Sequence, residues 1–270
     1  MLPTSVTVLA ICAGLTSIKF ALDGRPGIAV VLLATAAVLD LLDGRVARIL
    51  NASSPMGKEI DSLADAIDFG VAPALVVYVS LLSSSPAGWI VVLLYAACVA
   101  LRLSRFNAML DDGTQPAYTQ KFFVGMPAPA AAGMAILPLV AKVQIGEGWW
   151  TSQWFYCPWL VACSVLVVSR LPMKKLPAVA VRPNPAVLLA LLATVAATAF
   201  LFPYIVIMVV NVAYLCHIPF SVASHRWLAA HPEAWGEKAK QRRARRATGR
   251  PRRTTGRLAQ LRLHGPDQTK

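Results

Sequence analysis

The sequence predicts an all-α polytopic membrane protein with about eight transmembrane helices. Of its 270 residues, 57% are hydrophobic and only 14% are charged, which is a low charge content for a soluble protein. The apolar residues come in runs of about 18 to 25, which are long enough to cross a hydrocarbon core as helices. Because such runs recur along most of the chain, a soluble globular fold is excluded.

Turn-forming sequences separate the apolar runs and set the ends of the expected helices. They are DGRPG at 23–27, SSSPAG at 83–88, DDGTQP at 111–116, GEG at 146–148 and RPNP at 182–185. Only Pro203 interrupts residues 185–222, so this region is either a tight hairpin or one long kinked helix. The predicted spans are 4–22, 27–50, 57–82, 87–110, 122–142, 154–171, 185–201 and 203–222.

Charge divides the chain into a transmembrane catalytic domain, residues 1–225, and a basic tail, residues 226–270. The tail holds 13 of the 26 Lys and Arg residues and only three acids. It is polar and has no apolar period, so we expect it to be disordered or to lie loosely on anionic lipid headgroups. A solvated tail without a partner is the simpler alternative, and no nucleic-acid partner is expected.

Basic residues also predict the orientation. With eight spans and both termini on one side, that side receives 23 of the 26 Lys and Arg residues, and the other receives Lys19, Arg25 and Lys142. The positive-inside rule therefore places the termini in the cytoplasm, and we expect an integral protein of a bacterial cell membrane.

Four carboxylates lie where the second and third spans meet the cytoplasm. Asp40 and Asp43 are three residues apart and Asp61 and Asp65 are four apart, so each pair shares one helix face. The intervening ASSP at 52–55 supplies a helix cap and a starting proline. Two antiparallel helices joined in this way would turn all four acids toward one point.

A divalent cation is the expected partner of these acids. An unpaired Asp near the bilayer centre costs roughly 2.5–3.5 kcal/mol, and mutual repulsion adds to that cost. Salt bridges to Arg45, Arg48 and Lys58 are an alternative, but three cations cannot neutralise five nearby acids, Glu59 included. An all-oxygen shell suits Mg²⁺, Mn²⁺ or Ca²⁺.

The neighbouring residues suit a diphosphate substrate. Gly44, Ala47 and Gly57 leave room beside the acids, and Arg48 offers a planar fork for a phosphate. Metal ions together with an arginine would hold a pyrophosphate and stabilise the group being transferred.

The whole pattern resembles the signature of the CDP-alcohol phosphatidyltransferases. It reads Asp40-x-x-Asp43-Gly44-x-x-Ala47-Arg48, eight residues, then Gly57-x-x-x-Asp61-x-x-x-Asp65. The resemblance implies a six-helix membrane core, here with extra helices, and a homodimer. It also implies that a CDP-linked lipid donates its phosphatidyl group to an alcohol and releases CMP.

The resemblance assigns roles to the signature residues. Asp40, Asp43, Asp61 and Asp65 would ligate one or two Mg²⁺ or Mn²⁺ ions. Asp65, with Asp61 beside it in the catalytic pair, would be the general base that deprotonates the acceptor. The donor would be bound by Gly44, Ala47, Arg48 and Gly57, together with Thr7 in a PTSVT start that is similar to the Pro-Asn-x-x-Thr of one branch.

That branch is the phosphatidylserine synthases, and three more stretches are similar to it. They are DSLADAIDFGVAPA at 61–74, ALRLSRFN at 100–107 and KFFVGMPAPAAAG at 121–133. The likeness implies L-serine as the acceptor, with Arg102, Arg105, Asn107 and Lys121 as candidate serine-binding residues.

Two positions depart from the branch. Thr4 stands where Asn is usual, and Asp68 stands where Ser is expected. Asp68 would either extend the metal shell, meet the serine ammonium, or simply be an acid at a helix end.

Three alternatives to this assignment stay open. The two arginines could instead anchor their helix at the membrane interface. Sister enzymes use glycerol 3-phosphate or inositol phosphate, whose dianionic phosphate would need a denser basic pocket. A cation transporter would scatter its acids over several helices near the bilayer centre, whereas these acids cluster at one helix pair.

Overall fold

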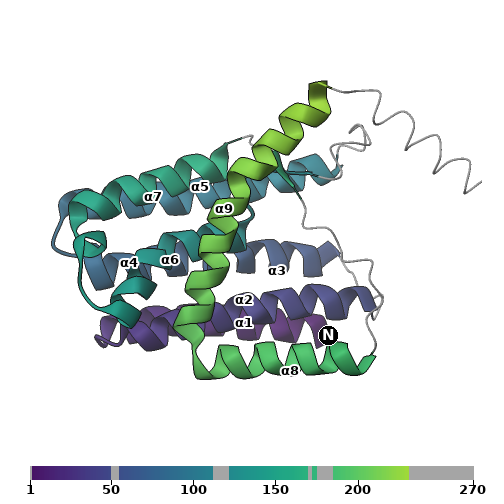
Figure 1. The fold of residues 1–270 in the computed structure, drawn as a ribbon, viewed down its shortest axis with the longest axis horizontal. Helices are drawn as coiled ribbons and strands as arrows, with labels where there is room; N and C mark the ends of the chain where they lie inside the picture. The colour runs from purple at the N-terminus through teal and green to yellow at the C-terminus, as the bar shows by residue number, and fades with distance from the viewer. Residues whose placement is uncertain (1, 50–54, 112–121, 170–171, 175–184, 231–270) are drawn as a thin grey trace, which may run out of the picture. The chain divides into compact units, whose positions relative to one another are not determined.

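The described part of the chain folds almost entirely into helices, as a computed structural model shows (Figure 1). The structure describes residues 2–49, 55–111, 122–169, 172–174 and 185–230. It divides into two units, Met1–His225 and Arg226–Lys270. Nearly all of the second unit, and with it the predicted basic tail, lies outside the described residues.

Helices α1 to α5 make up the first part of the larger unit. Five helices of the chain begin on a proline, whose fixed φ and missing N–H suit a first helical turn. The elements are α1 (Leu2–Leu22), α2 (Pro26–Ile49), α3 (Pro55–Asp65), η1 (Ala66–Val71), α4 (Ala72–Val77), η2 (Tyr78–Leu82) and α5 (Pro86–Asp111). Here η1 and η2 are stretches of π-helix within the continuous helix that α3, η1, α4 and η2 form over residues 55–82.

The later elements are mainly helical too, and the exception is one short pair of strands, β1 and β2. They are β1 (Phe122–Val124), α6 (Ala128–Ile145), the short 3₁₀ turn η4 (Trp149–Thr151), α7 (Gln153–Val168), β2 (Pro172–Lys174), α8 (Pro185–Leu201) and α9 (Pro203–Ala230). The prediction of a helical membrane protein is confirmed. Residues 185–222 form two helices, because Phe202 leaves the helical conformation and Pro203 starts α9.

Six of the described helices are long and apolar enough to cross a membrane. They are Ser5–Leu22, Pro26–Arg45, Glu59–Leu82, Pro86–Ala108, Ala128–Ile145 and Pro203–Ser221. Gln153–Val168 and Leu189–Leu201 are apolar but shorter. These eight segments correspond to the eight predicted spans, of which two fall below the length of a full crossing.

The predicted span 122–142 begins too early, because α6 starts only at Ala128. Phe122–Val124 instead form strand β1, which pairs antiparallel with Pro172–Lys174 of β2. Gly125 ends the strand with φ +79°, and a Cβ there would lie 2.7 Å from the carbonyl oxygen of Ser169. The turn therefore requires glycine, and the chain enters α6 only after it.

Side chains of α7 complete the backbone of α6 around an internal proline. Pro138 has no N–H, so the carbonyl of Met134 loses its helical donor. The indole Nε1–H of Trp159 donates to that carbonyl at 2.9 Å, and the hydroxyl of Tyr156 donates to the next one, Ala135, at 2.6 Å. Both contacts tie α7 to α6 where water is scarce.

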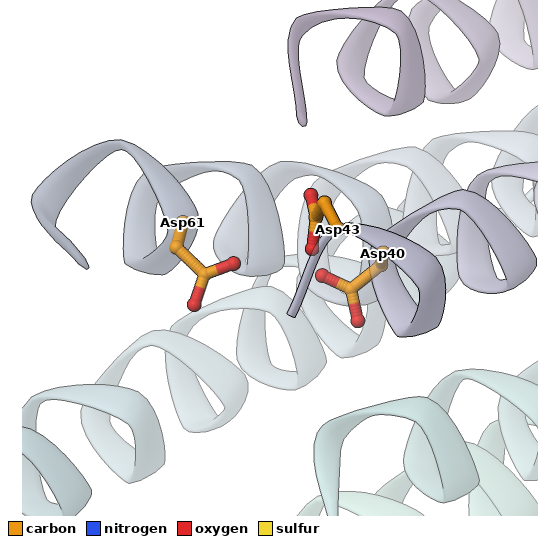
Figure 2. Close-up of side chains that lie close together, drawn as sticks. All are labelled: Asp40, Asp43 and Asp61. Carbon is orange, nitrogen blue, oxygen red and sulfur yellow. The ribbon is translucent and has the colours of Figure 1, made fainter. Parts of the chain in front are cut away.

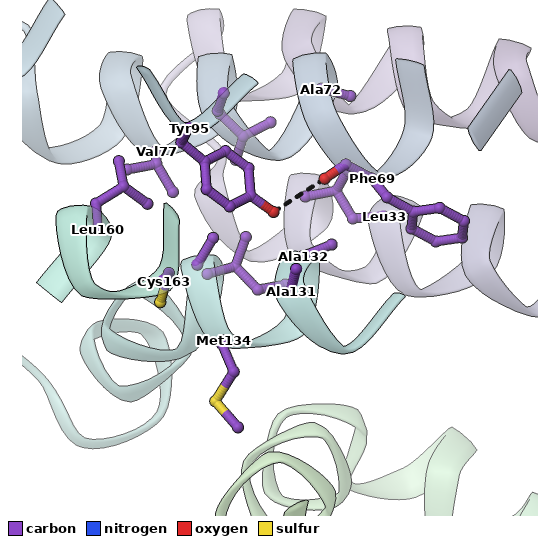
Figure 3. Close-up of a cluster of buried hydrophobic side chains, with 14 of the residues drawn as sticks. Leu33, Phe69, Ala72, Val77, Tyr95, Ala131, Ala132, Met134, Leu160 and Cys163 are labelled. Atoms are coloured by element: carbon purple, nitrogen blue, oxygen red, sulfur yellow. Dashed lines mark hydrogen bonds between the residues drawn. The ribbon is translucent and has the colours of Figure 1, made fainter. Parts of the chain in front are cut away.

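A second carbonyl that a proline leaves without its helical donor lies at the π-helical turn η1, and it too accepts from a side chain of another helix. Pro73 cannot donate to the carbonyl of Phe69 four residues earlier, and Tyr95 of α5 donates to it at 3.0 Å (Figure 3). The Ala72 N–H reaches back five residues to Ile67, which is the π-type bond. The widened turn directly follows Asp65, so it changes the direction in which the next residues point.

Candidate active site

Two helices bring the predicted carboxylates together. Asp40 and Asp43 come from the C-terminal half of α2, and Asp61 comes from α3. One carboxylate oxygen from each lies within 4.8 Å of the others, and Figure 2 shows the three groups facing a common point. The predicted helix pair thus converges as expected, and three acids form a cluster that could hold a divalent cation.

Asp65 lies at the edge of this cluster in a different environment. Its side chain is within hydrogen-bonding reach of Asp40, and its charge interacts with Asp61 and with Arg102 of α5. Asp65 is half-buried, whereas Asp61 is exposed. The two acids of α3 therefore differ in setting although they lie one helical turn apart.

Helix α1 closes the other side of the cluster. Asp43 is only 3% exposed, and Thr7 of α1 lies beside it. Thr7 and the backbone of Gly44 lie within hydrogen-bonding reach of Asp43, and both of its carboxylate oxygens are shielded from solvent. A buried carboxylate in this state is costly unless a cation approaches it.

The donor set fits a hard divalent cation. Asp40, Asp43 and Asp61 offer only oxygen atoms as metal ligands. Carboxylate oxygens are the ligands that Mg²⁺, Mn²⁺ and Ca²⁺ prefer, whereas zinc sites favour nitrogen and sulfur. Asp40, Asp43 and Asp61, with Asp65 adjoining, are therefore residues that could hold such an ion.

The predicted donor residues surround the cluster where they can be described. Gly44 follows Asp43 directly, and a Cβ at this position would meet no atom within 4 Å, so the space beside it is open. Gly57 lies near the start of α3, half-buried. Ala47 and Arg48 belong to α2, but their side chains lie outside the described part of the structure.

The predicted serine-binding residues separate into two groups. Arg102 is partly buried beside Asp65 and Tyr214, and its Nε has no hydrogen-bond partner among the described residues. Arg105 instead donates to the carbonyl of Val168 at the end of α7, at 3.0 Å. Asn107 donates to Ser62 at 2.9 Å and links α5 to α3.

Arg102 is therefore the arginine that the fold brings to the acids. The described contacts of Arg105 and Asn107 hold helices together. The fourth candidate, Lys121, lies outside the described residues.

Two residues near the acids were not assigned a role from the sequence. Tyr214 of α9 has a buried hydroxyl without a hydrogen-bond partner among the described residues, and it lies beside Arg102. Gly14 of α1 meets Asp68, and a Cβ on the glycine would collide with a carboxylate oxygen. Tyr214 stands three residues after Asn211 in an apolar run. This spacing puts two polar side chains on one face of an apolar helix, and it is the sequence pattern that could have indicated Tyr214.

Comparison with known proteins agrees with this geometry. Residues 1–169 match the family model described as CDP-alcohol phosphatidyltransferase. A protein of Mycobacterium tuberculosis named CDP-diacylglycerol–serine O-phosphatidyltransferase is 61% identical over 268 residues, covering 98% of this chain and 94% of the relative. A Helicobacter pylori protein of the same name is 36% identical over 174 residues, covering 63% of this chain and 70% of the relative.

A relative that matches a shorter part of the chain carries a different name. The archaetidylserine synthase of Methanothermobacter thermautotrophicus is 38% identical over 133 residues, which cover 48% of this chain and 54% of the relative.

Proposed function

Because this chain belongs to the CDP-alcohol phosphatidyltransferase family, we propose that it transfers the phosphatidyl group of CDP-diacylglycerol to L-serine. The products are phosphatidylserine and CMP. The observation that carries this assignment is the 61% identity, over nearly the whole chain, to a relative named for that reaction. The acid cluster at the α2–α3 junction, which could hold a divalent ion, supports this proposal.

Asp40, Asp43, Asp61 and Asp65 are the proposed holders of one or two divalent ions, Mg²⁺ or Mn²⁺. A bound ion would neutralise the donor diphosphate and the charge of the departing CMP. Gly44, with open space beside it, lets the donor approach the acids closely. Thr7, Ala47, Arg48 and Gly57 complete the proposed donor site.

Asp65 is the proposed general base. The serine hydroxyl oxygen attacks the phosphorus that bears the lipid, its proton passes to the Asp65 carboxylate, and the bond from phosphorus to the CMP oxygen breaks. A carboxylate held tightly by a metal is a weak base, so the base should be a loosely bound acid. Asp65 meets this condition, because it lies outside the three-acid cluster.

Arg102 is the proposed partner of the serine carboxylate. It lies beside Asp65, so a carboxylate bound to its guanidinium would hold the serine hydroxyl near the base. Arg105, Asn107 and Lys121 stay predicted contributors. We further propose that the reaction takes place at the cytoplasmic surface of the membrane, in a homodimer.

An acceptor panel tests the proposal. The purified full-length protein, given CDP-diacylglycerol and Mn²⁺, should release CMP when L-serine is added. Glycerol 3-phosphate and inositol phosphate should give no release above the background without acceptor. Release driven by either phosphate, and not by serine, would overturn the assignment.

A further inference from the structure

Asp68 of η1 is a buried acid that the proposed mechanism does not use. Its side chain is 2% exposed, and neither carboxylate oxygen has a hydrogen-bond partner among the described residues. The charges that act on it are those of Asp40 and Asp43, both negative. Burying an unpaired charge beside two like charges is costly, so this carboxyl is either protonated or balanced by a cation.

The fold makes room for this carboxylate. Asp68 lies in the π-helical turn Ala66–Val71, which follows Asp65, and it lines a cavity together with residues of α2. Gly14 of α1 faces it, and a Cβ there would collide with Oδ1 of Asp68. Helix α1 thus has a glycine at the position where the carboxylate approaches its backbone.

We propose that Asp68 is a fifth carboxylate of the metal centre, whose negative charge strengthens cation binding at Asp40 and Asp43. Asp68 is not among the three acids whose oxygens lie within 4.8 Å of one another. It therefore acts through its negative charge beside Asp40 and Asp43, as a positioning residue. The inference rests on the metal centre of the proposed function, but it is independent of the acceptor.

The cavity next to Asp68 suggests one other role, recognition of the serine ammonium. Asp68, Asn211 and Tyr214 are the polar residues lining a cavity of about 360 Å³ between α2, α6 and α9. The other lining residues are apolar or glycine, including Leu33 and Ile136. A zwitterion would be poorly solvated there, so the metal role is favoured and the ammonium role becomes an outcome of the test.

The test is a Mn²⁺ titration of the purified full-length protein without substrates. The thermal unfolding midpoint, measured at each Mn²⁺ concentration, reports the binding. Asp68→Asn and Asp68→Ser should raise the half-saturating Mn²⁺ concentration about ten- to a hundredfold. Without metal, both variants should unfold at the native midpoint or above it, because a buried repulsion is removed. Gly14→Ala, which displaces the carboxylate without removing it, should also weaken Mn²⁺ binding.

Two control variants show the Mn²⁺ responses expected for complete loss and for no change. Asp61→Asn removes a cluster acid and should abolish the Mn²⁺ response. Asn211→Ala removes a buried, uncharged side chain from the same cavity and should keep the native half-saturation.

An unchanged half-saturation in both Asp68 variants would overturn the inference, and so would a raised serine KM with unchanged Mn²⁺ binding. A native protein without any Mn²⁺ response would overturn the metal centre itself. A normal Mn²⁺ titration in a protein that does not use serine would refute only the acceptor, so the two failures are distinguishable.

Discussion

Asp61 and Asp65 show how position along one helix separates two roles. Asp61 is exposed and shares the 4.8 Å cluster with Asp40 and Asp43. Asp65, one turn later, is half-buried and lies near Arg102. The sequence alone predicted both acids at the site, but their different surroundings come from the packing of α5 against this region.

Asp65→Asn should lower kcat for CMP release about 10²- to 10⁴-fold, because the amide cannot take the serine proton. Binding of CDP-diacylglycerol should largely persist, which a thermal shift with donor alone would measure. The matched control is Asp23→Asn, since Asp23 is an exposed acid paired with Lys19 in the α1–α2 turn. Full activity of the Asp65 variant would contradict the base assignment.

Arg102→Ala should raise the serine KM about tenfold or more, because a hydrogen-bonded charge contact is lost. The donor KM should stay near its native value. Arg105→Ala is the comparison: it removes the bond to Val168, so it should lower the unfolding midpoint and should raise the serine KM less than Arg102→Ala does. Steady-state kinetics and thermal unfolding of both variants check this, and equal effects on the two KM values in Arg102→Ala would point to a structural role.

At the scale of elements, prolines decide both the helix ends and the contacts between helices. Five helices begin on proline, which is why the predicted boundaries mostly agree with the observed ones. The internal prolines Pro73 and Pro138 free carbonyls that side chains of neighbouring helices then satisfy. These cross-helix contacts depend on tertiary packing, so local sequence patterns could not predict them.

Two further features could not be predicted from local sequence patterns. The π-helical turn η1 and the β1–β2 pair arise from contacts between distant residues, such as Phe123 opposite Met173. The signature predicted the convergence of the acids because spacing along two helices determines their faces. It could not predict that Tyr214, far along the chain, lies beside Arg102.

Trp159→Phe tests the role of these contacts. It should lower the free energy of unfolding by about 1 kcal/mol, because the carbonyl of Met134 loses its donor. In a Pro138→Ala background the restored N–H can donate to that carbonyl, so the same change should cost less. The coupling energy comes from unfolding the native protein, the two single variants and the double variant in mixed micelles. An equal cost of Trp159→Phe in both backgrounds would contradict the role of Trp159 as the replacement donor.

At the scale of the whole molecule, the reaction requires the acid cluster to face the compartment that supplies the nucleotide-linked lipid. The positive-inside rule predicts that the α2–α3 end lies in the cytoplasm and the η2–α5 end outside. Met56 and Ser83 are exposed residues near these opposite ends.

Single cysteines test this orientation in a background without the five native ones. In intact cells, a membrane-impermeant thiol reagent should label Ser83→Cys and should leave Met56→Cys unlabelled. Permeabilised cells should label both, which controls for reactivity. Labelling of Met56→Cys alone in intact cells would show the opposite orientation.

The most direct measurement follows an oxygen atom. L-serine labelled with ¹⁸O in its hydroxyl group is incubated with the protein, CDP-diacylglycerol and Mn²⁺, and the masses of the products are measured by mass spectrometry. Attack by the serine hydroxyl on the lipid-bearing phosphorus predicts phosphatidylserine that retains the label and CMP that carries none. Label in CMP, or no labelled phosphatidylserine, would contradict the proposed reaction.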